Sequence, residues 1–112
     1  MEEGKIYDTS AVIELIARRK YRHIDGYITI FTVIEYPLVL NYVEKIIYPS
    51  KKDYMLAIKW QIELRRRGNP LPAIDLLIAA IAFNRDMEIV SLNRHFKDIK
   101  SIEPSLKLIS KI

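Results

Sequence analysis

The sequence PLPAIDLLIAAIAF at Pro70–Phe83 is the stretch that decides the fold we expect. From Ala73 to Phe83 every residue except Asp75 is apolar, so the segment has no polar face and is predicted to be a helix buried on all sides. It is too short to cross a bilayer, which takes roughly 20 apolar residues. Because Pro72 is a helix-start signal, Asp75 falls in the first turn, beside the positive end of the helix dipole.

Two interpretations of Asp75 are open at this point. As a structural residue, its carboxylate would accept hydrogen bonds from the free backbone N–H groups at the start of the helix. As a functional residue, it would be one of several carboxylates gathered in one place. The choice between them depends on whether other acids in the chain can reach the same position.

The composition predicts one globular domain, residues 1–112, that is long enough to bury a core. Half of the residues are hydrophobic and 29% are charged, which is not the composition of a disordered chain. Cysteine is absent, so thiolate metal sites and thiol catalysis are excluded. The first residues, MEEGKIYD, do not resemble a secretory signal, so we expect a cytoplasmic protein that does not enter a membrane. The net charge of +4 favours a polyanionic partner such as nucleic acid.

Strands and helices are expected to alternate along the chain. The predicted strands are Lys5–Asp8, Tyr27–Ile30, Met87–Leu92 and, at an edge, Ser105–Ser110. The predicted helices are Ala11–Arg18, a helix that continues from about Thr32 to about Tyr48, Lys51–Arg67, and the buried helix that ends near Arg85. This order predicts an α/β fold, a three-layer α/β/α sandwich around a central, mostly parallel sheet of about four strands.

Glu35 has a structural explanation of its own. Thr32 and Glu35 have the spacing of a capping box, in which the glutamate side chain reaches back to the N–H of the cap residue. Pro37 complicates this helix, because proline in a helix interior removes a hydrogen bond and crowds the preceding turn. The helix is therefore expected to start after Thr32 or to bend at Pro37.

The helix after Pro49 is predicted to begin with Ser50 and Asp53 as its start signal. Tyr54, Ile58 and Ile62 form the apolar side of an amphipathic surface helix, whose core side is filled by Trp60 and Leu64. Arg65, Arg66 and Arg67 end this helix. They either complement the negative end of its dipole or contact RNA phosphates, and the sequence leaves both roles open.

The chemistry is expected at the carboxyl ends of the parallel strands, where sites assemble in such folds. Four side chains converge there in the predicted topology: Asp8, Glu35, Asp75 and Asn93. Three partly desolvated carboxylates repel one another and would bind protons unless a cation neutralised them. Oxygen ligands suit a hard ion, Mg²⁺ or Mn²⁺, and the sequence has no histidine or cysteine set with zinc spacing.

Four segments of the sequence resemble, in order, the motifs of PIN-domain proteins, and most closely those of the small VapC-type toxins of toxin–antitoxin pairs. These segments are YDTSAVIEL at Tyr7–Leu15, ITIFTVIEYPLV at Ile28–Val39, RRRGNPLPAIDLLIAAIA at Arg65–Ala82 and IVSLNRHF at Ile89–Phe96. The resemblance covers nearly the whole chain. The first and third segments are the most specific, and the segment between Asn41 and Leu64 is the least specific.

The resemblance implies a metal-dependent endoribonuclease in which Asp8, Glu35 and Asp75 hold Mg²⁺ or Mn²⁺. It also implies cleavage of RNA by in-line attack of a metal-activated water, and partnership with a small antitoxin protein within a homodimeric assembly. Small hydroxyl residues support the site in the family, and the matching residues here are Thr9, Ser10 and Ser91. Candidate RNA contacts are Arg65, Arg66, Arg67 and Arg94.

The sequence departs from the family pattern after the third predicted strand. One or two further acids usually follow this strand, whereas this chain has Asn93 and His95. Asn93 can offer a carbonyl oxygen in the catalytic set, and His95 is either a general acid near phosphate or a surface or capping residue. The alternative to a nuclease is therefore a PIN-like module that binds RNA or a protein partner without cutting RNA.

Overall fold

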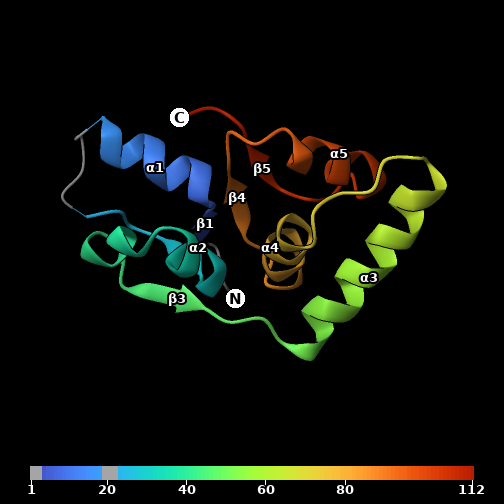
Figure 1. Cartoon of the computed structure of the whole chain (residues 1–112), viewed down its shortest axis with the longest axis horizontal. Coiled ribbons are helices and arrows are strands. Elements are labelled where there is room, and N and C mark those ends of the chain that lie inside the picture. The colour runs from blue at the N-terminus through green and yellow to red at the C-terminus, as the bar shows by residue number, and fades with distance from the viewer. Residues whose placement is uncertain (1–3, 19–22) are drawn as a thin grey trace.

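The fold is built on one five-stranded parallel sheet, seen in a computed structural model that describes residues 4–18 and 23–112. The strands lie in the order β3–β2–β1–β4–β5 (Figure 1). Their bounds are β1 Lys5–Tyr7, β2 Tyr27–Thr29, β3 Lys45–Ile47, β4 Glu88–Val90 and β5 Leu108–Ile109. In the central strand, Ile6 lies opposite Tyr27 on one side and Ile89 on the other. The predicted parallel α/β sheet is confirmed.

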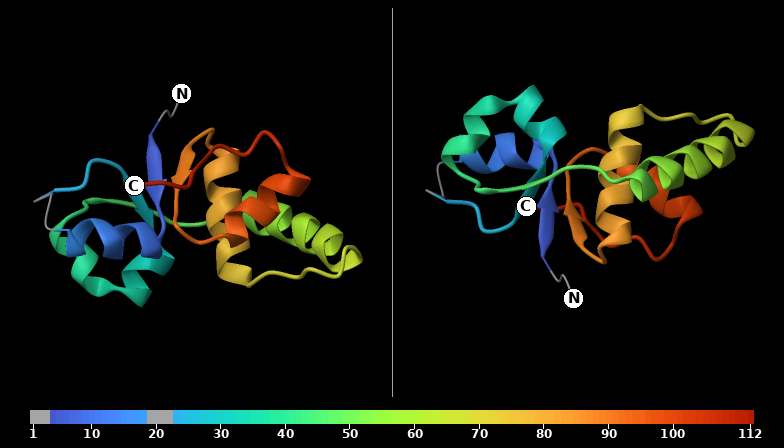
Figure 2. Two further views of the ribbon diagram at one scale, coloured as in Figure 1. Left: turned by 90° about the horizontal axis from the view of Figure 1, so that it is seen from above. Right: turned by 90° about the horizontal axis from the view of Figure 1, so that it is seen from below.

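Helices cover both faces of this sheet, as the three-layer prediction required (Figure 2). Their bounds are α1 Thr9–Ala17, α2 Ile30–Glu35, the 3₁₀-helix η1 Pro37–Asn41, α3 Lys51–Arg66, α4 Ala73–Asn84 and α5 His95–Ile102. On one face α1 and η1 pack on β2, through Val12, Val39 and Ile28. On the other face α3, α4 and α5 pack on β1 and β4. None of the helices formed by the described residues is long and apolar enough to span a membrane.

The helix α4 matches the prediction from its sequence. Leu76 and residues 78–82 are buried, so most of the helix is enclosed by α3, α5 and the sheet. Its first turn is the exception, because Ile74 is 38% exposed. Burial on all sides therefore begins after the turn that contains Asp75.

The prediction of one long helix from about Thr32 to about Tyr48 is wrong. The helix α2 ends at Glu35, Pro37 then begins η1, and Lys45–Ile47 forms the strand β3. Proline has no N–H for the bond that a continuing α-helix needs, but it is tolerated in the first turn of a new helix. β3 pairs with β2, so the sheet has five strands rather than about four.

The predicted capping box between Thr32 and Glu35 is also absent. The N-cap of α2 is Thr29, Thr32 is buried within the helix, and Glu35 is its last residue. The helix starts directly where β2 ends, three residues before the cap that the sequence suggested. This brings Glu35 to the end of α2 and leaves its carboxylate available for other contacts.

The helix α3 starts at the predicted capping box of Ser50 and Asp53, but its apolar side is not the side that faces the core. The core-facing residues are Asp53, Ala57, Trp60 and Leu64, and the ring of Trp60 meets that of Phe83 edge-on at 5.7 Å. The side chains that the pattern marked as the apolar side are about half exposed or more: Tyr54, Ile58 and Ile62. They lie roughly 90° to 170° around the helix from the buried row.

A buried carboxylate ties the start of α3 to the end of α4. Asp53 is fully buried and accepts hydrogen bonds from the backbone N–H of Ser50 at 2.7 Å, Asn84 Nδ2 at 2.9 Å and Arg85 Nη1 at 3.2 Å. Burial alone would raise the pKa of Asp53, but the Ser50, Arg85 and Asn84 bonds and the Arg85 charge together hold it below its ordinary value of 3.8. The folded protein therefore favours the ionised form of Asp53.

We predict that Asp53→Ala lowers the free energy of unfolding at pH 7 by about 3 kcal/mol, because it leaves the Arg85 charge and two N–H donors without their partner. Since the folded pKa is depressed, the contribution of Asp53 is present above about pH 4 and is lost as the pH falls through the folded pKa. The difference between variant and parent should be constant from neutral pH to about pH 5 and shrink below about pH 4.

Urea unfolding at a series of pH values measures this effect. Glu63→Ala is the matched control in the same helix, since Glu63 forms ion pairs with the exposed Arg66 and Arg67. This substitution should lower the free energy of unfolding by less than about 1 kcal/mol. Equal losses for the two variants would show that the Asp53 network does not hold α3 to α4.

Candidate functional site

The candidate site lies where the parallel strands end. Because all strands run the same way, their carboxyl ends meet at one edge of the sheet. Asp8 directly follows β1, and Ser91 directly follows β4, its neighbour in the sheet. The helix α4 runs back along the sheet into β4, so its first turn, with Asp75, lies at the same edge.

Asp8 is the most enclosed acid of the site. It is 5% exposed and caps α1, where Oδ1 accepts hydrogen bonds from Ala11 N at 3.0 Å and Ser10 Oγ at 2.7 Å. Its other oxygen, Oδ2, accepts from Ser91 Oγ at 2.5 Å. The hydroxyl oxygen of Ser10 in turn accepts a hydrogen bond from the backbone N–H of Leu92, and that of Ser91 accepts one from the backbone N–H of Asn93. Ser10 and Ser91 therefore support Asp8 directly.

The environment of Asp8 disfavours its charge. Burial raises the pKa of Asp8 above its ordinary value, the hydrogen bonds from Ser91, Ala11 and Ser10 counteract this, and the negative charge of Asp75 raises the pKa further. Asp8 and Asp75 are thus close enough to repel each other, although they are 67 residues apart in the chain. A bound cation would relieve this repulsion and would favour the ionised form of both groups.

Asp75 contacts side chains rather than the backbone at the start of its helix. Its Oδ2 lies 2.6 Å from His95 Nδ1 and accepts a longer hydrogen bond, 3.4 Å, from Asn93 Nδ2. The Asp75 side chain is 16% exposed, so it stands at the rim of the core. The structural interpretation of Asp75 as a helix cap is not what the geometry shows.

Glu35 takes part in a separate pair at this edge. Its carboxylate is exposed and accepts a hydrogen bond of 2.6 Å from Thr9 Oγ1. Since the single hydroxyl proton of Thr9 goes to Glu35, the 3.0 Å contact between Thr9 and the buried Thr32 is a hydrogen bond donated by Thr32. Thr9 follows Asp8 in the chain, so Glu35 lies next to the Asp8 side of the site.

The donor chemistry of this edge suits a divalent cation, although the side chains are not gathered around one point. Among the described residues, no three aspartate, glutamate, histidine or cysteine side chains are grouped closely enough to hold a metal ion. The charge of Asp75 acts on Asp8, and His95 and Asn93 contact Asp75. Glu35 is connected to this group by its hydrogen bond from Thr9, the residue after Asp8. Three carboxylates, an amide and an imidazole are thus available at one edge of the sheet.

Thr32 is a contact that the sequence did not assign to the site, and His95 is one whose role the sequence left open between a general acid and a surface or capping residue. The position of His95 two residues after Asn93, where the family pattern has acids, was the available signal. Nothing in the local sequence pointed to Thr32, because its side chain appeared to cap a helix that in fact begins earlier. The Oδ1 atom of Asn93 accepts a hydrogen bond from the backbone N–H of His95 at 3.0 Å.

The four arginines predicted to contact RNA fall into two groups. Arg94 is exposed and lies in the chain between Asn93 and His95, which both contact Asp75. The other three are at the end of α3, which lies far from α1 and α2 (Figures 1 and 2). Of these, Arg66 and Arg67 form ion pairs with Glu63.

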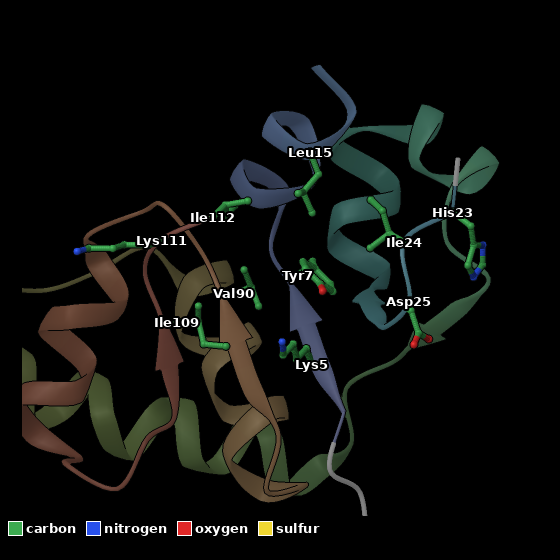
Figure 3. Close-up of a pocket in the computed structure, with 10 residues that line it drawn as sticks. All are labelled: Lys5, Tyr7, Leu15, His23, Ile24, Asp25, Val90, Ile109, Lys111 and Ile112. Atoms are coloured by element: carbon green, nitrogen blue, oxygen red, sulfur yellow. The ribbon is translucent and has the colours of Figure 1, made fainter. Parts of the chain in front are cut away.

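A cavity of about 350 Å³ lies on the α1 side of the sheet and is distinct from this edge (Figure 3). Its lining comes from three strands, from Leu15 of α1, and from the segments 23–25 and 111–112. Tyr7 and Val90 line it and directly precede Asp8 and Ser91. None of the predicted site residues is among its lining residues.

Comparison with known proteins identifies the fold. Neither a protein-family model nor a curated protein sequence matches this chain. Several solved structures match nearly its whole length. A chain of VapBC from Salmonella typhimurium, solved bound to DNA, has a TM-score of 0.75 and 17% identity and covers 96% of this chain and 98% of its own. A chain of VapBC-1 from nontypeable Haemophilus influenzae has a TM-score of 0.69 and 18% identity, with coverages of 94% and 96%.

The third match is a chain of a toxin–antitoxin complex from Klebsiella pneumoniae, with a TM-score of 0.64, 17% identity, and coverages of 94% and 95%. Identities of 17–18% are low, but the matches cover 94–96% of this chain. The PIN-like fold that the sequence motifs predicted is thereby confirmed as a fold, and it is the fold of chains found in VapBC complexes.

Proposed function

We propose that this chain is a divalent-metal-dependent endoribonuclease that hydrolyses RNA phosphodiester bonds, and that it is the toxin of a toxin–antitoxin pair. The observation that carries the proposal is the pair of carboxylates, Asp8 and Asp75, which hydrogen bonds through the turn after β4 connect at the carboxyl edge of a VapC-like sheet. Two acids that serve only the fold are seldom buried next to each other, because the charge of each makes the other more costly to ionise. In a cation-binding site both acids are useful, because the bound cation neutralises their charges.

The residues of this edge have distinct roles in the proposed reaction. Asp8, Asp75 and Glu35 would hold Mg²⁺ or Mn²⁺, and the bound ion would lower the pKa of the attacking water and stabilise charge on the phosphate. Ser10 and Ser91 fix the orientation of Asp8 through their hydroxyl protons. Thr9 holds Glu35 in the same way, and Asn93 holds the start of α5 beside Asp75.

The RNA is expected to lie over the start of α5. Arg94 is exposed there and is next to the residues that contact Asp75, so its guanidinium can pair with a phosphate near the reacting bond. The arginines Arg65, Arg66 and Arg67 would contact RNA only where a longer strand extends toward the end of α3. A net charge of +4 supports binding of a polyanion in either case.

Protein partners form part of the proposal. The matched structures are VapBC complexes, and one is described as a toxin–antitoxin complex, which supports an antitoxin as a partner of this chain. Exposed apolar side chains gather on α3, at Tyr54, Met55, Ile58 and Ile62, and on α2 and η1, at Ile34, Leu38 and Leu40. Contiguous exposed apolar side chains mark protein interaction surfaces, and two such surfaces suit both an antitoxin and a homodimer. The site of action would be the cytoplasm.

The second candidate is a module that binds RNA or protein without cutting RNA. It is favoured by Asn93 and His95, which stand where the family pattern has acids, and by the separation of Glu35 from the Asp8 and Asp75 pair. A metal titration followed by a cleavage assay distinguishes the two functions. A binding module would retain affinity for RNA and show no turnover with Mg²⁺ or Mn²⁺.

We predict that Asp75→Asn abolishes Mn²⁺-dependent cleavage of single-stranded RNA, with a loss of at least about a hundredfold in rate, because the amide cannot supply the charge that holds the cation. The fold should remain intact, since Asn is nearly isosteric and can still contact His95. Cleavage of a labelled RNA measures the first effect and circular dichroism the second.

Glu88→Gln is the control for this experiment, because it makes the same acid-to-amide change at the amino end of β4, at the opposite edge of the sheet. It should leave the rate within about twofold of the parent. Cleavage by Asp75→Asn at the parent rate would refute the assignment of the site.

We further predict that Arg94→Ala weakens RNA binding and reduces the slope of log affinity against log salt by about 0.7, the value for one lost phosphate contact on a single strand. Fluorescence anisotropy with a short RNA in EDTA measures binding without cleavage. Arg66→Ala is the matched control, because Arg66 pairs with Glu63 away from the site. If Arg66→Ala changes the slope and Arg94→Ala does not, RNA binds along α3 rather than over α5.

A further inference from the structure

The side chain that contacts Asp75 most closely is His95, whose role the sequence left open. His95 Nδ1 lies 2.6 Å from Asp75 Oδ2, and the His95 side chain is 36% exposed. His95 is the first residue of α5 and thus stands at the mouth of the site rather than in the core. Its ring is accessible from solvent and at the same time is in contact with a proposed metal ligand.

A chain of hydrogen bonds holds His95 in this position. Ser91 Oγ donates to Asp8 Oδ2 and accepts the N–H of Asn93 at 2.9 Å. Asn93 Oδ1 accepts the N–H of His95 at 3.0 Å, and the His95 ring completes the path to Asp75. The turn from β4 to α5 therefore connects the two repelling acids, and the histidine is the last link.

A helix-start role does not account for the imidazole. The start of α5 is satisfied by the Asn93 side chain, which takes the backbone N–H of His95 and would do so for any residue at position 95. The ring is left to contact Asp75 alone. A side chain placed by its neighbours against a single carboxylate is better explained by what it does with that carboxylate.

We infer that His95 is a ligand of the divalent ion through a ring nitrogen, so that the site combines oxygen and nitrogen donors. This inference rests on the proposed function, because it assumes that Asp75 holds a cation. Imidazole suits Ni²⁺ and Zn²⁺ best and Mn²⁺ less well, whereas Mg²⁺ takes oxygen ligands and keeps its waters. The exchange of a family acid for His95 therefore changes the preferred metal from Mg²⁺ toward Mn²⁺ and the later transition ions.

Electron spin-echo spectroscopy of the Mn²⁺ complex tests this directly, with Mn²⁺ alone as the probe. A coordinated imidazole gives ¹⁴N modulation, which we expect in the parent protein and not in His95→Ala or His95→Gln. The affinity for Mn²⁺, from calorimetry, should fall at least about tenfold in both variants. His95→Asp should remove the ¹⁴N signal while it raises affinity for Mg²⁺ relative to Mn²⁺.

His23→Ala is the matched control, because His23 is the one other histidine of the sequence and lines the separate cavity beside Ile24 (Figure 3). This variant should keep both the ¹⁴N signal and the affinity. Circular dichroism in EDTA establishes that each variant is folded, and His95→Gln replaces His95→Ala if the alanine variant does not fold.

The results separate this inference from the proposed nuclease. A parent Mn²⁺ complex without ¹⁴N modulation overturns the inference, even if RNA is cleaved. Mn²⁺ binding that is unchanged or tighter in His95→Ala also overturns it, and would mean that His95 is a counter-ion that the metal displaces. Mn²⁺ binding with ¹⁴N modulation but no RNA cleavage supports the ligand and refutes the nuclease. Absence of Mn²⁺ binding by the parent refutes both.

Discussion

The burial of the Asp8 charge is the constraint on which the rest of the site depends. An ionised carboxylate that leaves water costs several kcal/mol unless hydrogen bonds replace its hydration. Asp8 receives three such bonds: those from Ser10 and the backbone of α1 are local to the start of that helix, and the one from Ser91 requires β1 and β4 to end side by side. The sheet order thus supplies one of the three bonds that favour ionised Asp8, whereas burial, and to a smaller extent the charge of Asp75, raise its pKa.

The sequence predicts those parts of the molecule that follow from local pattern and strand direction. The apolar run of α4 identifies a buried helix, and the alternation of strands and helices implies a parallel sheet whose carboxyl ends meet. Asp8 and Asp75 then fall at one edge without further information. The strand β3 could not be found in this way, because the long apolar run that contains α2 and η1 has no clear period, and a short apolar segment is ambiguous between helix and strand.

Contacts between distant side chains explain the remaining differences. Local spacing paired Glu35 with Thr32, whereas in the folded chain Glu35 and Thr32 both bind Thr9, which is more than 20 residues away in sequence. The identity of His95 was readable, but its contact with Asp75 depends on the exact turn that Ser91 and Asn93 impose after β4. Spacing along a chain predicts which residues share a face of a helix. It does not predict with which of several polar neighbours a side chain will form a hydrogen bond.

The exchange of acids for Asn93 and His95 has a consequence for the folded protein without metal. A further carboxylate beside Asp75 would add repulsion to an edge where Asp8 already has a raised pKa. Asn93 and His95 place an N–H donor and an imidazole there instead, and both contact Asp75 Oδ2. The metal-free edge is thus less strained, and a cation that binds Asp75 must first displace these contacts. Under the proposed function, these contacts would favour the metal-free protein and lower its affinity for the ion, and His95 as a nitrogen ligand would restore part of that affinity.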